Sequence, residues 1–151
     1  MEARLSPSAV APGAYKAMLG LQGYIDTCSI EPSLQELVKT RASQINGCAF
    51  CIAMHTRDAR KEGETEERLY LLDAWRETPL YSDRERAALA WTEAVTLVAD
   101  GHVPDAVYEE ARRQFSDREL VDLTMVIVTI NGWNRLAISF RSVPEVAGRN
   151  G

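Results

Sequence analysis

The chain has 151 residues, of which 46% are hydrophobic and 26% are charged, and these proportions exclude the disordered and fibrous classes of protein. This length is enough for one domain whose core needs no disulfide or metal to hold it together. A formal net charge of -5 and the lack of a basic run argue against a nucleic-acid partner.

Helical patterns dominate the sequence, and no stretch alternates between apolar and polar residues for long enough to predict a strand. Proline, glycine and polar capping residues set the expected ends of the helices. We therefore predict one all-α domain of six or seven helices over residues 1–151. In chain order the expected helices cover about 12–27, from just after Pro32 to Asn46, from near Cys48 to Gly63, 66–76, 83–99, 104–114 and 117–140.

Two of these helices share one start signal, the tetrapeptide "SDRE" at 82–85 and again at 116–119. In each copy a serine precedes a glutamate by three residues, which is the spacing of a capping box. The residues that follow do not align, so the two copies do not indicate an internal repeat.

The most apolar segment, residues 120–140, is long enough to be mistaken for a membrane span. It contains Asp122, Asn131, Asn134 and Arg135, and each of these side chains would be costly in hydrocarbon. We expect a helix buried in the core or at a subunit contact, and no membrane association. Because the N-terminus lacks the features of a signal peptide, we also expect a cytoplasmic protein, whose thiols are normally reduced.

Chemistry-bearing residues are concentrated in "NGCAFCIAMH" at 46–55. On a helix, Cys48 and Cys51 lie about 60° apart and His55 lies about 20° from Cys48, so all three side chains share one face. A cysteine pair in the first turn can close a disulfide, and the helix dipole favours a thiolate there. The spacing predicts redox chemistry, with His55 as a proton acceptor.

Histidine usually needs an orienting partner, and Glu36 is the candidate. On a continuous helix Glu36 would lie about 18 Å from Cys48. A break at Asn46 and Gly47 would fold the chain back on itself and bring Glu36 to within about 4 or 5 Å of His55 along the helix axis. We infer the order Glu36, His55, Cys51, Cys48, with Cys51 as the inner thiol and Cys48 as the outer one.

Glu36, an interval of eleven residues and "CAFCIAMH" resemble the core motif of the alkylhydroperoxidase D-like (AhpD-like) branch of the carboxymuconolactone decarboxylase family. The resemblance is strongest from about 34 to 77, and "RERAALAWTEAVT" is similar to the helix that normally follows. It implies an AhpD-like helical fold completed by assembly into dimers, trimers or hexamers.

For function, the resemblance implies an antioxidant peroxidase in which Glu36, Cys48, Cys51 and His55 are catalytic. The cysteine pair would reduce an organic hydroperoxide to an alcohol, become a disulfide, and be reset by an external thiol or dithiol, with no cofactor and no metal. Alkylhydroperoxidase D itself has a second histidine where this chain has Phe50, so one relay residue is missing. We favour Cys51 as the attacking thiol and Cys48 as the thiol that resolves it and meets the reductant.

Three other interpretations stay open. The cysteine pair could serve a general thiol-disulfide oxidoreductase, or it could consist of buried small hydrophobic residues. Two thiolates, an imidazole and the carboxylate of Glu36 could also hold zinc in a non-catalytic assembly module. Among the remaining residues, Cys28 is expected to be structural and His102 to lie exposed in a turn.

Overall fold

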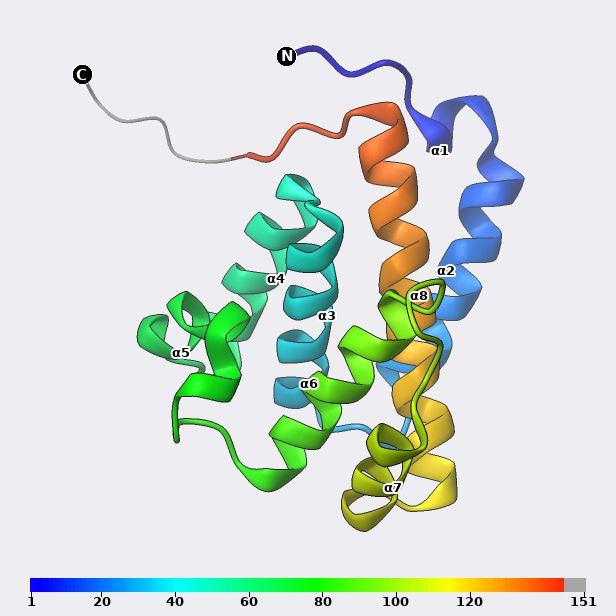
Figure 1. Cartoon of the computed structure of the whole chain (residues 1–151). Coiled ribbons are helices and arrows are strands. Elements are labelled where there is room, and N and C mark those ends of the chain that lie inside the picture. The colour runs from blue at the N-terminus through cyan, green and yellow to red at the C-terminus, as the bar shows by residue number, and fades with distance from the viewer. Residues whose placement is uncertain (146–151) are drawn as a thin grey trace, which may run out of the picture.

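The structure, a computed structural model that describes residues 1–145, is built from helices and contains no strand in that range (Figure 1). The elements in chain order are α1 (Pro7–Val10), α2 (Pro12–Asp26), α3 (Pro32–Asn46), α4 (Ala49–Lys61), α5 (Glu66–Tyr70), the 3-10 helix η1 (Leu72–Glu77), α6 (Asp83–Thr96), α7 (Asp105–Gln114) and α8 (Asp117–Phe140). The predicted all-α class is therefore confirmed. The final residues of the single domain that we predicted, 146–151, lie outside the described range.

Both predicted capping boxes are present. Ser82 Oγ and Ser116 Oγ each accept a hydrogen bond of 3.2 Å from the backbone amide of the glutamate three residues later. The carboxylates of Glu85 and Glu119 accept in return from the serine amides, at 2.8 and 2.9 Å. Amides that a helix N-terminus leaves without partners are satisfied in this way, which explains why α6 and α8 begin where the sequence predicts.

Three boundaries differ from the prediction. The expected helix over 66–76 is two elements, because the chain tightens into the 3-10 turn of η1, which buries Leu72 and Trp75. The four-residue helix α1 is too short to give a periodic signal, and α6 ends at Thr96 rather than 99. "Six or seven helices" is therefore too low a count for residues 1–145.

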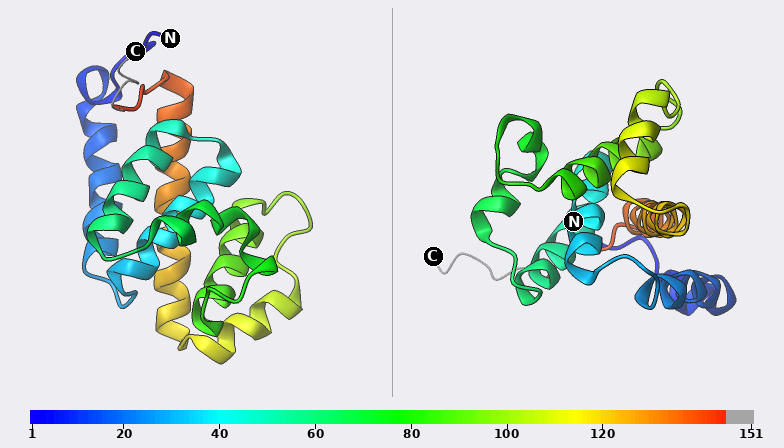
Figure 2. Two further views of the ribbon diagram at one scale, coloured as in Figure 1. Left: turned by 90° about the vertical axis from the view of Figure 1, so that its left-hand side faces the viewer. Right: turned by 90° about the horizontal axis from the view of Figure 1, so that it is seen from below.

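Helix α3 lies at the centre of the molecule, where it packs against α4, α6 and α8 (Figures 1 and 2). At its end Gly47 adopts a left-handed conformation with φ of 69°, and the amide of Cys48 bonds to the carbonyl of Ser43 at 2.9 Å. Glycine adopts positive φ at little cost, so it can end the helix and reverse the chain. Consequently α3 and α4 form the antiparallel hairpin that the sequence predicted.

Helix α8 runs alongside α2 and α3, and its polar side chains find partners inside the chain. The fully buried Asn134 accepts from Asn46 Nδ2 at 2.9 Å and donates to Ser43 Oγ at 3.0 Å. Buried amides of this kind must be hydrogen bonded, and here they join α8 to the end of α3. The expected core position of this helix is confirmed, and among the described residues no helix is both long enough and apolar enough to cross a membrane.

Candidate active site

The cysteine pair lies at the start of α4. Cys48 is the N-cap residue, and its Sγ lies 3.4 Å from the backbone nitrogen of Cys51. A disulfide joins the sulfur atoms of Cys48 and Cys51. Both residues are 1% exposed. They pack in a small apolar cluster with Ala42 and Ile130, so the sulfur atoms are held between α3, α4 and α8.

Burial does not distinguish Cys48, the expected outer thiol, from Cys51, the expected inner one. Cys48 is as buried as Cys51, because Ala42 and Ile130 pack against it, and Cys51 is the residue that lines a cavity. The helix start places Cys48 at an N-terminus, but a neighbouring helix covers that position. Of the two cysteines, Cys51 is therefore the one that a cavity reaches.

One turn beyond the cysteines, His55 is 8% exposed and bonds to a carboxylate on the neighbouring helix. Its Nδ1 lies 2.8 Å from Glu36 Oε2, and Glu36 Oε1 accepts from Lys39 Nζ at 2.9 Å. The hairpin thus brings together Glu36 and His55, as predicted. Because a carboxylate can only accept, Nδ1 carries the proton and Nε2 is left to exchange one.

The charge of Glu36 is set by its two partners. Burial by itself raises the pKa of the carboxyl, but the hydrogen bond from His55 and the positive charge of Lys39 outweigh it, so the pKa lies below its ordinary value. Glu36 is therefore an anion at neutral pH, and it can stabilise a positive charge on the imidazole of His55.

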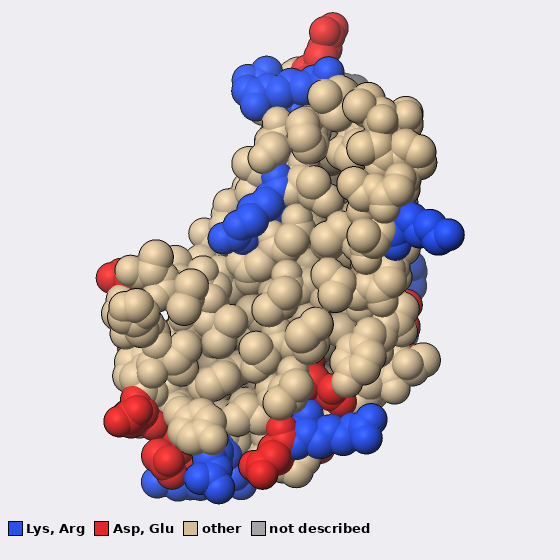
Figure 3. All heavy atoms as spheres, turned by 90° about the vertical axis from the view of Figure 1, so that its right-hand side faces the viewer, with Lys and Arg blue, Asp and Glu red and all other residues tan. Residues whose placement is uncertain are grey.

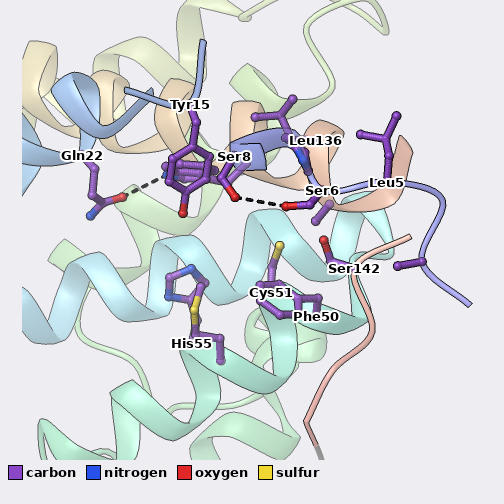
Figure 4. A pocket seen from close by; sticks show the side chains of 15 residues that line it. Leu5, Ser6, Ser8, Tyr15, Gln22, Phe50, Cys51, His55, Leu136 and Ser142 are labelled. Carbon is purple, nitrogen blue, oxygen red and sulfur yellow. Dashed lines mark hydrogen bonds between the residues drawn. The ribbon is translucent and has the colours of Figure 1, made fainter. Parts of the chain in front are cut away.

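A cavity of about 510 Å³ opens beside these groups, and Cys51 and His55 form part of its wall (Figure 4). Its other walls come from α2, α4, α8 and the N-terminal segment, and they are largely apolar. They include Leu5, Tyr15, Phe50, Met54, Trp133, Leu136 and Ala137. The size and the mixture of apolar walls with few reactive groups are those of a small-molecule site.

The sequence did not point to several residues of this site. Lys39 is 7% exposed and lies three residues after Glu36, so the helical spacing could have placed the two side chains together. Trp133 on α8 is a second such residue. It lines the cavity, where its ring meets Tyr15 edge-on at 5.4 Å and its Nε1 donates to Gln22 Oε1 at 3.1 Å. No short-range pattern links α2 to α8, so Tyr15 and Gln22 required the tertiary structure.

The other expectations for single residues concern Phe50, Cys28 and His102. Phe50 lines the cavity as an apolar wall, and no second histidine takes the place of the relay residue in the wall of this cavity. Cys28 is a partly buried free thiol beside the main core, with Gln35 Nε2 at 3.5 Å from its sulfur. His102 lies exposed in the loop before α7 and has a positive φ of 56°.

Donor atoms that could bind a metal within residues 1–145 come from Glu36, His55 and Asp58, and lie within 4.8 Å of one another. This set does not include the cysteines that the zinc interpretation needs, since the two sulfur atoms are bonded to each other. Both carboxylate oxygens of Glu36 already accept hydrogen bonds from Lys39 and His55. The group is therefore better described as a hydrogen-bond relay than as an open metal site.

Comparison with known proteins defines the class of this protein. The model of the carboxymuconolactone decarboxylase family matches residues 12–94, which include the hairpin and the site, and the chain belongs to this family. Its fold is that of the AhpD-like branch. One similar crystal structure is of a protein of unknown function from Agrobacterium tumefaciens, provisionally described as the antioxidant-defence protein AhpD. Its sequence is 42% identical and the TM-score is 0.94, over 97% of this chain and 100% of that one.

Two further relatives agree. The uncharacterized protein YdfG from Bacillus subtilis is 46% identical over 139 residues, which are 92% of this chain and 95% of that protein. An alkylhydroperoxidase AhpD core structure from Ralstonia eutropha is 18% identical with a TM-score of 0.80, over 91% of this chain and 74% of that one. At this identity the second likeness concerns the fold alone.

Proposed function

We propose that this protein is a thiol-dependent peroxidase of antioxidant defence, which reduces organic hydroperoxides through the Cys48 and Cys51 pair. The observation that carries the proposal is the position of Cys51 and His55 in the wall of one largely apolar cavity, with Glu36 behind the histidine. The description of the Agrobacterium relative as an antioxidant-defence protein supports the same function.

In the first step His55 Nε2 accepts the proton of the Cys51 thiol, and the charged imidazole is stabilised by Glu36. The thiolate attacks the terminal oxygen of the hydroperoxide, so a sulfur–oxygen bond forms and the oxygen–oxygen bond breaks. The leaving alkoxide takes the proton from His55 and departs as the alcohol. Cys51 is then a sulfenic acid.

In the second step the Cys48 thiol attacks the sulfur of Cys51, the disulfide forms, and the hydroxide takes the Cys48 proton and leaves as water. One hydroperoxide and two thiols therefore give one alcohol, one water and one disulfide. An external thiol or dithiol donates the two electrons that restore the cysteine pair and is itself oxidised. This cycle uses no metal and no organic cofactor.

The geometry favours Cys51 as the attacking thiol, because Cys51 lines the cavity together with His55 and Cys48 does not. The apolar walls favour an alkyl or aryl group over a sugar or a nucleotide. We also propose that the protein is cytoplasmic, where thiol reductants are abundant, and that it assembles into a homo-oligomer.

A thiol count tests this proposal. Fully reduced protein carries three thiols, and one equivalent of cumene hydroperoxide is expected to remove two of them rapidly. Cys51→Ser should abolish the reaction, whereas Cys48→Ser should leave a sulfenic acid that dimedone traps. Cys28→Ser is the matched control and should still lose two thiols.

The result also separates the alternatives. Survival of every thiol would overturn the peroxidase proposal. If the reduced pair then reacts with a small disulfide such as oxidised glutathione, the protein is a general thiol-disulfide oxidoreductase. If instead it retains zinc after purification and shows no thiol turnover, it is a metal-binding module.

A further inference from the structure

A second cavity of about 560 Å³ adjoins the first one, and nothing in the proposed reaction explains it. It lies between α2 and α8, beneath α1 and the N-terminal segment. Residues that line both cavities are Leu5, Pro7, Tyr15 and Leu136. These shared side chains place the two cavities next to each other, and the first of them reaches Cys51.

The walls of the second cavity are almost entirely apolar. They are formed by Val10, Ala11, Ala14, Met18, Gly132 and Phe140, together with the shared residues, Ser139 and Arg135. Each cavity alone has the volume of a site that holds a drug-sized molecule. A small alkyl hydroperoxide would occupy only the first cavity, so the second is suited to a long apolar chain.

One arginine lines the second cavity, and another donates a hydrogen bond to a residue of its wall. Arg135 lines the second cavity, and its Nη1 donates to the backbone oxygen and the Oδ1 of Asn131 at 3.1 and 2.9 Å. Arg4 Nη1 donates at 3.0 Å to the carbonyl of Ser139, another residue of the wall. Within residues 1–145 neither guanidinium forms an ion pair with an aspartate or a glutamate.

The surface around these residues has little negative charge. Neither cavity is lined by an aspartate or a glutamate. Figure 3 shows the side of the molecule that α2 covers: a broad part of it is uncharged, and most of its acidic side chains lie toward the lower end. An anionic group near Arg135 would therefore meet positive charge and no carboxylate in the cavity wall.

We propose that the two cavities bind a free long-chain fatty-acid hydroperoxide. The hydroperoxide group lies at Cys51 and His55, the hydrocarbon chain passes Tyr15 into the second cavity, and the carboxylate lies at Arg135, which lines that cavity. This substrate class rests on the proposed peroxidase function and undergoes the same reaction, in which the hydroxy fatty acid is the product.

The test compares kcat/KM for three oxidants: linoleic acid hydroperoxide, its methyl ester and tert-butyl hydroperoxide. Ala14 lines only the second cavity and is exposed, so Ala14→Phe fills that space without touching Cys51. We expect a fall of about tenfold for both long-chain oxidants and a change of less than about twofold for tert-butyl hydroperoxide. Ala14→Leu is the milder variant should Ala14→Phe fail to fold.

Arg135→Gln keeps the side chain polar but removes its charge. We expect kcat/KM to fall about tenfold for the free acid and to stay unchanged for the methyl ester, because only the acid carries a carboxylate. Arg113→Gln on α7 is the matched control, since Arg113 is exposed and pairs only with Glu110 among the described residues. It should leave all three rates unchanged.

Each failure has a distinct pattern. If the wild type reduces tert-butyl hydroperoxide but neither variant separates the oxidants, the fatty-acid site is wrong and the peroxidase function stands. If the wild type reduces none of the three, both proposals are wrong. If Ala14→Phe lowers the native mass measured by light scattering, the second cavity is covered by another copy of this chain rather than by substrate.

Discussion

At the scale of single residues, the reaction proposed for Cys51 would depend on a row of charged side chains that α3 and α4 share. Lys39 and His55 approach the two oxygens of Glu36 at 2.9 and 2.8 Å, and all three residues are largely buried. Lys39 is therefore a positioning residue, since it acts on His55 only through Glu36. Burial of an unpaired carboxylate would be costly, so each partner helps to keep Glu36 ionised.

Glu36→Gln tests this row. Glutamine keeps an oxygen that can accept from His55 Nδ1 but carries no charge to stabilise the imidazolium. We expect the rate of hydroperoxide consumption at pH 7 to fall about 100-fold, in the range found for general acid and base groups. Glu67→Gln, at an exposed position on α5, is the matched control and should have no effect. Equal rates for wild type and Glu36→Gln would remove Glu36 from the mechanism.

The same row has a defined pH dependence. The folded pKa of Glu36 is lowered from 4.5, so the stabilisation it provides is fully present above about pH 4.5 and is lost as the pH falls through the lower folded value. Lys39→Met removes one cause of this lowering. Its acid unfolding, followed by circular dichroism, should therefore begin at a higher pH than that of the wild type.

At the scale of elements, the turn between α3 and α4 brings the site together. Gly47 has φ of 69°, and a Cβ at this position would meet no atom within 4 Å. Gly47→Ala therefore introduces backbone strain without a clash. We expect it to lower the free energy of unfolding in urea by about 1 kcal/mol.

Gly13 is the matched control, and its replacement by alanine should not lower the free energy of unfolding. Gly13 lies in the first turn of α2, and its Cβ would likewise meet no atom within 4 Å. Because its φ is not positive, Gly13→Ala should leave stability unchanged or raise it slightly, by up to about 1 kcal/mol. If both variants behaved alike, the left-handed turn would not be the reason for glycine at position 47.

At the scale of the whole molecule, α8 exposes apolar side chains that a monomer does not need. Val121 and Val128 are 61% and 45% exposed and lie seven residues apart, so they share one face of the helix. A stripe of this kind is typical of a subunit contact. The proposed homo-oligomer is expected to use it.

Val128→Glu tests the contact. Light scattering of the wild type should give a mass that is a multiple of 16.8 kDa, and the variant should shift to the monomer mass because the contact would bury an unpaired charge. Val98→Glu, at an exposed loop position after α6, is the matched control and should keep the native mass. A wild type that is monomeric at micromolar concentration would contradict the proposal.

The sequence by itself determined the all-α class, the positions of most helices and the turn that brings Glu36 to His55. Capping boxes, prolines and the Asn46–Gly47 pair are local signals, and they act over a few residues, so the starts of α6 and α8 and the turn after α3 were predicted correctly. The approach of Glu36 to His55 followed from helix geometry once that turn was assumed. The break between α5 and η1 did not follow from local signals, because it depends on what Leu72 and Trp75 pack against.

Only the tertiary structure decided what surrounds the reactive group. Cys48 is buried by α3 and α8, the cavity at Cys51 lies between α2, α4 and α8, and the second cavity lies between α2 and α8. Helix α8 is far from the other three helices in the sequence. Contacts between such distant segments depend on how whole faces pack, and a short pattern does not encode them. The residues of the proposed reaction therefore follow from short sequence patterns, whereas the cavities beside them depend on the complete fold.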